Sequence, residues 1–376
     1  MSHCPWPYRS ISISGNSILP CCKFQGNIEI KQDIEQEFKY GEMNTIRQRL
    51  DSGEKISECS ECWSDEDRGV KSFRQKGIDD WGIVTDPEIR YVEYDLDNTC
   101  NLKCISCSSN NSSAWLEDEK KVYGQSAFLG RNVTEDYKNI DLSKLDTVKF
   151  FGGEPLLSKN ITKVCQDVIA ANNIDNLRVF TNTNITVLPK QEMEYIWVNC
   201  RQLHLSLSID GIGDLHNFIR YGTDWTVIEN NLKYYDRLID QRKGNTNIIV
   251  HVTAYIYNIN KLHTIREFLQ QKFPRFILDI EPLFRPKFLS IINTPTDFKL
   301  QTIEYLKKHG FDSIVPYLSY NEENMFDYFV TAHRRLVKLR SIDFEKINPE
   351  LHKYIEQYPT KPIEDKRLFE LRIGHD

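Results

Sequence analysis

The sequence lacks any long hydrophobic run. No stretch reaches the roughly 18 consecutive apolar residues that a membrane-spanning helix requires. The opening residues, MSHCPWPYRS, carry neither the charged leader nor the apolar core of a secretory signal. We therefore expect a cytoplasmic protein without a membrane partner.

The sequence also lacks an excess of positive charge. Its 48 Lys and Arg residues are outnumbered by 54 Asp and Glu residues, which gives a net charge of -6 and a pI near 5.9. A protein that neutralises many phosphates needs the opposite balance, so we expect no nucleic-acid partner. The basic run HRRLVKLR, His333 to Arg340, carries apolar residues at helical spacing and predicts a solvated helix face.

Cysteine, by contrast, is plentiful and unevenly distributed. Of the ten cysteines, Cys165 and Cys200 stand alone in apolar or helical surroundings and are predicted core thiols. The other eight lie in the first 107 residues: Cys4, Cys21, Cys22, Cys59, Cys62, Cys100, Cys104 and Cys107. Cytoplasmic thiols stay reduced, so this density favours metal ligands over disulfides.

Cys100, Cys104 and Cys107 form the pattern CxxxCxxC at the end of the run RYVEYDLDNTCNLKCISC. Three thiolates on one short loop can hold three irons of a 4Fe-4S cluster and leave the fourth iron without a protein ligand. Zinc also takes thiolates, usually with a further Cys or His nearby. The next histidine after Cys107 is His204. The pattern favours a cluster, and zinc remains the alternative.

From residue 90 onward, six runs rich in Val, Ile, Phe, Tyr and Thr alternate with amphipathic stretches such as Asn160 to Ala171 and Thr226 to Ile239. The runs are RYVEYDLD, TVKFFGG, NLRVFTNT, QLHLSLSID, NIIVHVTAYI and FILDIEPL, and each predicts a strand. Such alternation is typical of βα units around a parallel sheet. Six strands do not close a TIM barrel, so we predict an α/β fold with a partial (β/α)6 barrel and chemistry at the carboxyl ends of its strands.

Residues 1–82 differ in character from this core. Short extended pieces around Gly15-Asn16 predict a hairpin, and Asn44 to Leu50 predicts a helix. We therefore predict a small cysteine-rich module over residues 1–82. The stretch Gly77 to Glu88 is its predicted linker to the barrel, over residues 83–285.

The remaining part, residues 286–376, is a predicted C-terminal helical extension. Its apolar periodicity predicts helices over Phe298 to Leu306 and Phe326 to Leu339, packed on the open sheet. The last residues, TKPIEDKRLFELRIGHD, predict a frayed or peripheral tail.

The second predicted strand ends in FFGGEP, where adjacent glycines remove two Cβ atoms and let a cationic amino group approach backbone carbonyls. The alternative is that FFGGEP forms a strand-to-helix turn and binds no ligand. CxxxCxxC, GGEP, TNTN and SLSIDG follow the first four predicted strands in that order. Together they resemble the core of the radical S-adenosylmethionine (radical SAM) enzymes, over about Arg90 to Pro282.

The resemblance implies that SAM chelates the open iron and that residues at the strand ends bind SAM. Arg220 would grip the methionine carboxylate through two hydrogen bonds. The other implied SAM-binding residues are Gly152, Gly153, Glu154 and Pro155 near the amino group, and Asn182, Ser206 and Ser208 along the SAM path. In many members of the family, an aromatic residue directly before the third cysteine lies near the adenine of SAM. This chain has Ser106 at that position, so the resemblance implies no such contact here.

The N-terminal segment resembles a twitch or SPASM-like auxiliary-cluster domain, here placed before the barrel. The resemblance implies a second 4Fe-4S cluster held by Cys4, Cys59, Cys62 and one of Cys21 and Cys22. Adjacent strand residues point to opposite faces, so one of the pair would reach the metal, and Cys21 follows the Pro as in the family pattern. Four thiolates also suit zinc, which stays open as an alternative.

The resemblance therefore implies a radical SAM oxidoreductase or modifying enzyme. An electron from a reductant such as flavodoxin or ferredoxin would cleave SAM and yield a 5′-deoxyadenosyl radical, which removes a hydrogen atom from a substrate C–H bond. The substrate would be a peptide or a small molecule, and the auxiliary cluster could assist dehydrogenation or cross-linking. The alternative is a non-catalytic binding protein whose cysteines hold structural zinc.

Overall fold

The computed structural model describes residues 2–31, 33–128, 139–318, 323–359 and 362–373. These residues form one nine-stranded sheet in the order β3-β2-β1-β4-β5-β6-β7-β8-β9. The strands are β1 (Ser10–Ser14), β2 (Ser17–Leu19), β3 (Ile28–Glu29), β4 (Tyr91–Asp95), β5 (Thr147–Phe150), β6 (Arg178–Thr183), β7 (Gln202–Ser208), β8 (Asn245–Ala254) and β9 (Ile277–Pro282). The six predicted strands are β4 to β9, and they pair in parallel in chain order, which confirms the predicted α/β architecture.

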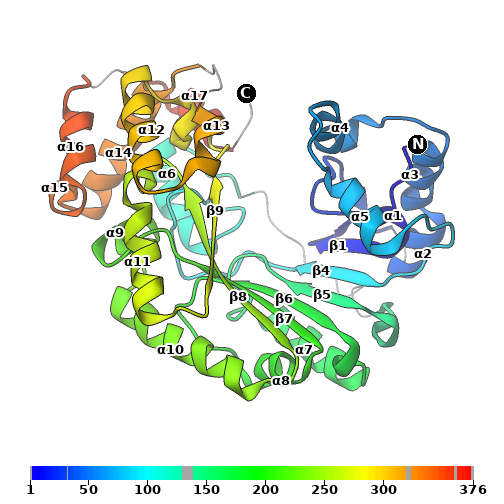
Figure 1. Cartoon of the computed structure of the whole chain (residues 1–376). Coiled ribbons are helices and arrows are strands. Elements are labelled where there is room, and N and C mark those ends of the chain that lie inside the picture. Colours follow the sequence, from blue (N-terminus) through cyan, green and yellow to red (C-terminus); the bar gives the residue numbers. More distant parts are fainter. Residues whose placement is uncertain (1, 32, 129–138, 319–322, 360–361, 374–376) are drawn as a thin grey trace.

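The strands show the two-residue alternation of a half-buried sheet. In β7, Leu203, Leu205 and Leu207 are fully buried, whereas Ser206 and Ser208 are half-buried on the opposite face. Helices cover the apolar face (Figure 1): α7 (Lys159–Ala170), α8 (Gln191–Asn199), α10 (Trp225–Gln241) and α11 (Leu262–Lys272). The opposite, concave face is left polar.

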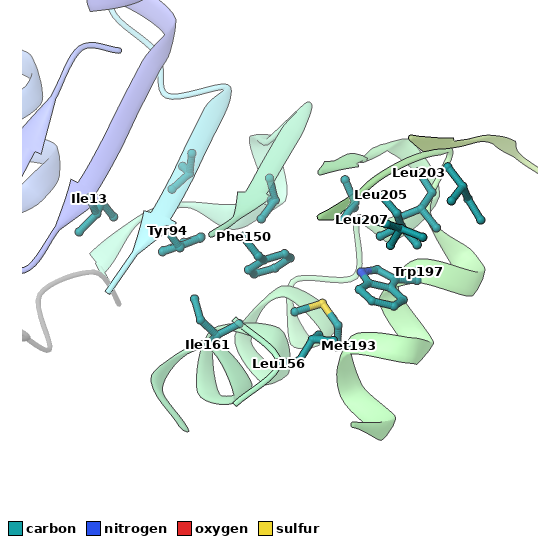
Figure 2. Close-up of a cluster of buried hydrophobic side chains, with 14 of the residues drawn as sticks. Ile13, Tyr94, Phe150, Leu156, Ile161, Met193, Trp197, Leu203, Leu205 and Leu207 are labelled. Atoms are coloured by element: carbon teal, nitrogen blue, oxygen red, sulfur yellow. The ribbon is translucent and has the colours of Figure 1, made fainter. Parts of the chain in front are cut away.

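The main core lies between the sheet and these helices. Figure 2 shows Tyr94 of β4 and Phe150 of β5 facing Ile161 of α7, with Trp197 of α8 beneath the β7 leucines. Ile13 of β1 belongs to the same cluster and is fully buried. The apolar core therefore runs without a break from the N-terminal strands into the barrel strands.

The N-terminal segment extends the barrel sheet at its β4 edge. β1 pairs in parallel with β4, and β1 and β2 form the predicted hairpin, with Gly15 at φ 57° in the turn. Its helices are α1 (Trp6–Arg9), α2 (Ile34–Tyr40), α3 (Glu42–Asp51), α4 (Ser60–Asp67) and α5 (Phe73–Trp81). Figure 1 shows this segment at one end of the sheet. The division into three parts remains a prediction.

The predicted linker from Gly77 is wrong in its first part, because α5 runs through it to Trp81. Ser72 and Gln75 form a capping box that starts this helix. A Cβ at Gly77 would lie 2.5 Å from Nε1 of Trp6, so the helix packs closely on the N-terminal segment. In the predicted linker, only the part from Gly82 onward has neither helix nor strand.

The C-terminal part contains more buried structure than the sequence indicated. Its helices are α12 (Thr296–Lys308), α13 (Val315–Leu318), α14 (Phe326–Arg340), α15 (Phe344–Ile347), α16 (Pro349–Glu356) and α17 (Asp365–Ile373). The tail prediction is wrong for its described residues, because Leu368 and Leu371 of α17 are buried in a second apolar cluster. The solvated-face prediction is also wrong at both ends of the run, since His333 and Arg340 are buried. Of the described helices, none is long and apolar enough to cross a membrane.

Candidate active site

The three-cysteine loop follows β4 and lies over the carboxyl ends of the barrel strands. Cys100, Cys104 and Cys107 are all partly buried. Burial raises the pKa of the Cys104 thiol to about 12 and that of Cys107 to about 11. The charge of Cys100 adds to both rises, and the charge of Arg220 opposes them. The loop therefore places Cys104 and Cys107 within electrostatic range of Cys100 and Arg220.

The backbone of the loop pairs with the segment that follows β7. The N–H groups of Lys103 and Ile105 donate to the carbonyls of Tyr221 and Ile219 at 2.8 and 2.9 Å. Ile219 is the last residue of helix α9 (Asp214–Ile219), and Arg220 comes next in the chain. This pairing brings Arg220 to the cysteines although more than a hundred residues separate them in sequence.

The two glycines of GGEP pack against the start of the cysteine loop. A Cβ at Gly152, whose φ is +129°, would stand 2.8 Å from Oδ1 of Asp95 and 2.9 Å from the carbonyl oxygen of Asp97. A Cβ at Gly153 would stand 2.4 Å from the carbonyl oxygen of Thr99. Only glycine permits this close approach of the β5 end to the loop.

Glu154 is buried at the same place, with 1% of its surface exposed. Its carboxylate accepts hydrogen bonds from the N–H of Asn184 at 2.6 Å, the hydroxyl of Thr183 at 2.9 Å and the N–H of Leu156 at 3.2 Å. Burial raises the pKa of Glu154 to about 7, while these donors act in the opposite direction. Pro155, also buried, starts the turn into α7.

Arg220 is held between a buried carboxylate and a cysteine. Its Nε lies 2.8 Å from Oδ2 of Asp210, which is fully buried, and its Nη1 lies 3.8 Å from Sγ of Cys104. The other oxygen of Asp210 accepts from the N–H of Thr253 on β8 at 2.9 Å. Asp210 therefore fixes the direction of the guanidinium toward the cysteine loop.

Asn182, Ser206 and Ser208 lie on the concave face of the sheet. Asn182 pairs in register with Ser206, and the two alternate with residues whose side chains face the helices. Asn182 is exposed, and the two serines are half-buried. They form a polar row on the strands that end beneath the cysteine loop.

Two further residues of the site, Asn184 and Asp210, lie inside the TNTN and SLSIDG motifs, although no role was predicted for them. Asn184, the last residue of TNTN, donates from Nδ2 to Sγ of Cys100 at 3.8 Å and to Oδ1 of Asn101 at 3.1 Å. Asp210, the aspartate of SLSIDG, is the partner of Arg220. A polar residue within two positions of a strand end was the available signal for both.

A second group of cysteines surrounds a pocket in the N-terminal segment. Its empty volume is about 310 Å³, and it is lined by Cys4, Cys21, Cys59 and Cys62 together with Trp6, Lys23, Leu50, Phe73 and Arg74. Burial raises the pKa of each of these four thiols, and the charges of Cys59 and Cys62 act on Cys4.

Cys22 does not line this pocket. Burial raises the pKa of Cys22, and the charges that act on it are those of Glu93 on β4, Lys149 on β5 and the neighbouring Lys23. The predicted strand geometry of this pair is wrong, because β2 ends at Leu19 and Cys21 and Cys22 lie in a bend and a turn. The two cysteines nevertheless differ in surroundings, since Cys21 lines the pocket and Cys22 is exposed. Among the described residues, no three or more His, Cys, Asp or Glu side chains meet at a spacing suited to a single metal ion.

Comparisons with known proteins give partial similarities. No protein-family model matches the chain. Over 95 residues, which are 25% of this chain and 28% of the relative, it is 25% identical to the GTP 3',8-cyclase of Clostridium botulinum strain Hall. The cyclase of strain Okra matches to the same extent.

Two solved structures are similar over a larger part of the chain. Native anSMEcpe with bound AdoMet matches with 17% identity and a TM-score of 0.38, over 60% of this chain and 62% of that chain. Streptococcus suis SuiB bound to S-adenosylmethionine matches with 16% identity and a TM-score of 0.38, over 77% of this chain and 61% of that chain. The matched regions span less than two thirds of these relatives, so their activities are proposals for this chain.

Proposed function

We propose that this chain is a radical SAM enzyme. The observation that carries the proposal is the three-cysteine loop at the carboxyl ends of six parallel strands, beside buried Glu154 and half-buried Arg220. When bound, a 4Fe-4S cluster with SAM supplies the electron that cleaves SAM to methionine and a 5′-deoxyadenosyl radical, which abstracts a substrate hydrogen atom.

The chain's own residues fit a SAM-loaded cluster. Cys100, Cys104 and Cys107 supply three thiolates and no fourth ligand from the protein. The Arg220 guanidinium, fixed by Asp210, offers charge and hydrogen bonds to the methionine carboxylate.

The remaining proposed SAM-binding groups surround this point. GGEP, with Gly152, Gly153, Glu154 and Pro155, borders the methionine amino group. Glu154 supplies the carboxylate of this motif, which can carry a negative charge opposite an ammonium. Asn182, Ser206 and Ser208 line the concave face where the nucleoside and the substrate meet. These side chains orient SAM and help to exclude water from the radical.

We also propose a second 4Fe-4S cluster in the N-terminal segment, as in the twitch or SPASM-like subfamily. Cys4, Cys21, Cys59 and Cys62 line one pocket, and this supports Cys21 as the fourth ligand rather than Cys22. The lining offers only sulfur donors and apolar or cationic neighbours, which suits an anionic cluster. The cluster would accept an electron from a substrate radical or bind the substrate.

The substrate class is proposed from chemistry and similarity together. SuiB has been solved with a precursor peptide, SuiA, and that structure is 15% identical to this chain with a TM-score of 0.37. We propose a peptide or a small molecule as the substrate, bound against the polar concave face. A one-electron donor of the flavodoxin or ferredoxin class would supply the electron.

Metal analysis of protein reconstituted anaerobically with iron and sulfide tests the proposal. Two clusters predict about eight irons per chain, and the core cluster alone predicts about four. Protein that binds zinc and no iron would instead support the alternative, a non-catalytic binding protein with structural zinc.

A matched pair of variants tests the placement of the second cluster. Replacing Cys59 and Cys62 together with serine should lower the iron content by about four per chain. Cys22→Ser should leave the iron content unchanged, because Cys22 does not line the pocket. Equal iron loss in both proteins would show that the auxiliary ligands are wrongly assigned.

A further inference from the structure

Two arginines from the C-terminal helices reach the three-cysteine loop. Nη2 of Arg340, the last residue of α14, donates to the carbonyl oxygen of Lys103 at 2.9 Å. Nη1 of Arg372, on α17, donates to the carbonyl oxygen of Ile105 at 2.5 Å. These two carbonyls flank Cys104, so the arginines hold the loop on both sides of its central cysteine.

Both guanidinium groups lie deep in the protein, around Trp115. The guanidinium carbon of Arg340 lies 5.1 Å from the Trp115 ring centre and that of Arg372 lies 5.0 Å from it. The indole N–H of Trp115 donates to the carbonyl oxygen of Cys104 at 2.8 Å. The side chain of Arg372 has no exposed surface, and Arg340 is 7% exposed. The two charges are therefore poorly screened by water.

The residues that the structure describes do not fully compensate these charges. Among them, Arg372 forms one ion pair, with Glu119, whose oxygen lies 3.7 Å from its Nε. No carboxylate within the described ranges forms an ion pair with Arg340, since Asp118 pairs with Lys103 instead. Nε and Nη1 of Arg340, and Nε and Nη2 of Arg372, are buried without a hydrogen-bond partner in the described part of the chain.

Buried, incompletely paired cations are costly unless an anion offsets them. An anion held by the cysteine loop would offset them, because both guanidinium groups donate to backbone carbonyls directly beside Cys104. A thiolate-bound iron-sulfur cluster is anionic, and one-electron reduction adds a further negative charge.

We propose that Arg340 and Arg372 are positioning residues of the core cluster, which hold the loop through its carbonyls and favour the reduced cluster through their charge. The inference rests on the proposed function, because it requires the cluster on Cys100, Cys104 and Cys107. In the step concerned, one electron passes from the external reductant to the cluster, and no bond is formed or broken.

EPR-monitored potentiometry of the reconstituted, full-length protein, with dithionite as reductant, tests the charge role. The core cluster is identified as the signal that changes when SAM is added. In Arg340→Met and Arg372→Met, the equilibrium constant for its reduction should fall about tenfold, which corresponds to a midpoint about 59 mV lower for one electron. Arg340→Lys and Arg372→Lys keep the charge and should titrate near the wild type.

Arg367→Met is the matched control. Arg367 lies on α17 with Arg372, but 42% of its side chain is exposed. It should leave the midpoint unchanged. If Arg340→Met and Arg372→Met have the wild-type midpoint potential, the inference is overturned and the proposed function is unaffected. A wild-type protein without any SAM-responsive signal would overturn the proposed function and the inference with it.

Hydrogen exchange in metal-free protein separates the holding role from the charge role. Both the Met and the Lys variants lose the guanidinium that donates to the loop carbonyls, so amide exchange over residues 98–107 should rise in all of them. The Lys variants are included because an ammonium does not reproduce the guanidinium geometry. This readout also serves if a Met variant loads no cluster. Wild-type exchange in all four variants would overturn the holding role.

Discussion

Gly153 is the residue through which β5 contacts the cysteine loop. A Cβ there would meet the carbonyl oxygen of Thr99 at 2.4 Å and the carbonyl carbon of Asn98 at 2.7 Å, and both are backbone atoms. Gly153→Ala should therefore lower the free energy of unfolding by about 3 kcal/mol. It should also lower the iron retained after reconstitution. Thermal unfolding and iron analysis measure the two effects.

Gly53→Ala is a suitable control for this substitution. Gly53 has φ +97° and no heavy atom within 4 Å of its added Cβ, so alanine brings backbone strain without overpacking. That strain should cost about 1 kcal/mol and leave the iron content unchanged. A Gly153→Ala protein with wild-type stability and full iron would disprove the close contact.

At this scale the sequence predicted the motif residues but not all of their partners. The family resemblance implied Asn182, whereas Asn184 is the asparagine that contacts Cys100. Ile185 has φ +66°, so the chain leaves the extended conformation just after β6 and alternation no longer predicts direction. The roles of Arg340 and Arg372 depend on packing of distant helices, which local patterns do not encode.

Among the secondary-structure elements, β1 links the N-terminal segment to the barrel. Its Ile13 is fully buried in the core shown in Figure 2, and β1 pairs with β4 along five residues, from Ser10 to Ser14. Ile13→Ala should lower the free energy of unfolding by about 3 kcal/mol because a cavity forms in that shared core. Denaturant unfolding should still show one transition.

Ser14→Ala is the control on the same strand, because Ser14 is only half-buried, and its effect should stay below about 1 kcal/mol. Two separate transitions in Ile13→Ala, with the second at the wild-type midpoint, would contradict a shared core. That outcome would support residues 1–82 as an independent module.

The elements also show where sequence patterns fail. Helices α7, α10 and α14 were predicted within a residue or two of their ends, because each has a clear apolar stripe. Helix α17 was missed because its buried residues include a charged one, Arg372, and its segment is rich in charge. The parallel pairing of β1 with β4 spans about eighty residues, a contact that local patterns do not predict.

On the scale of the whole molecule, buried His333 should contribute a loss of stability in mild acid. His333 is 3% exposed, and burial lowers its pKa to about 3, so the folded protein resists the protonation that the unfolded chain accepts near its ordinary pKa. The stabilisation is complete above about pH 6.5 and is lost as the pH falls toward the folded pKa. Between pH 7.5 and 5 the His333 contribution to this loss is about 2 kcal/mol.

His333→Gln should remove that part of the pH dependence. Glutamine keeps a hydrogen-bonding partner for the hydroxyl of Tyr257, which lies 3.0 Å from Nδ1 of His333. Denaturant unfolding at pH 7.5 and pH 5 should show a difference between the two pH values about 2 kcal/mol smaller than in the wild type. The same difference in both proteins would mean that His333 is not a source of acid sensitivity.

The whole fold was largely predictable because the six barrel strands, their order and their alternation with helices follow from hydrophobic periodicity. The continuous nine-stranded sheet was not, since β1 to β3 are short and pair with strands far away in sequence. The candidate site follows the same rule. Cysteine spacing and GGEP marked its location, and the packing of C-terminal helices behind it required the structure.

The most direct test of the proposed activity is 5′-deoxyadenosine formation by cluster-loaded protein given SAM and dithionite without oxygen. We expect the wild type to form 5′-deoxyadenosine and methionine in equal amounts. Cys104→Ala should form neither, because it lacks one of the three thiolates of the core site. Undiminished formation by Cys104→Ala, or none by an iron-loaded wild type, would contradict the assignment of a radical SAM active site to this loop.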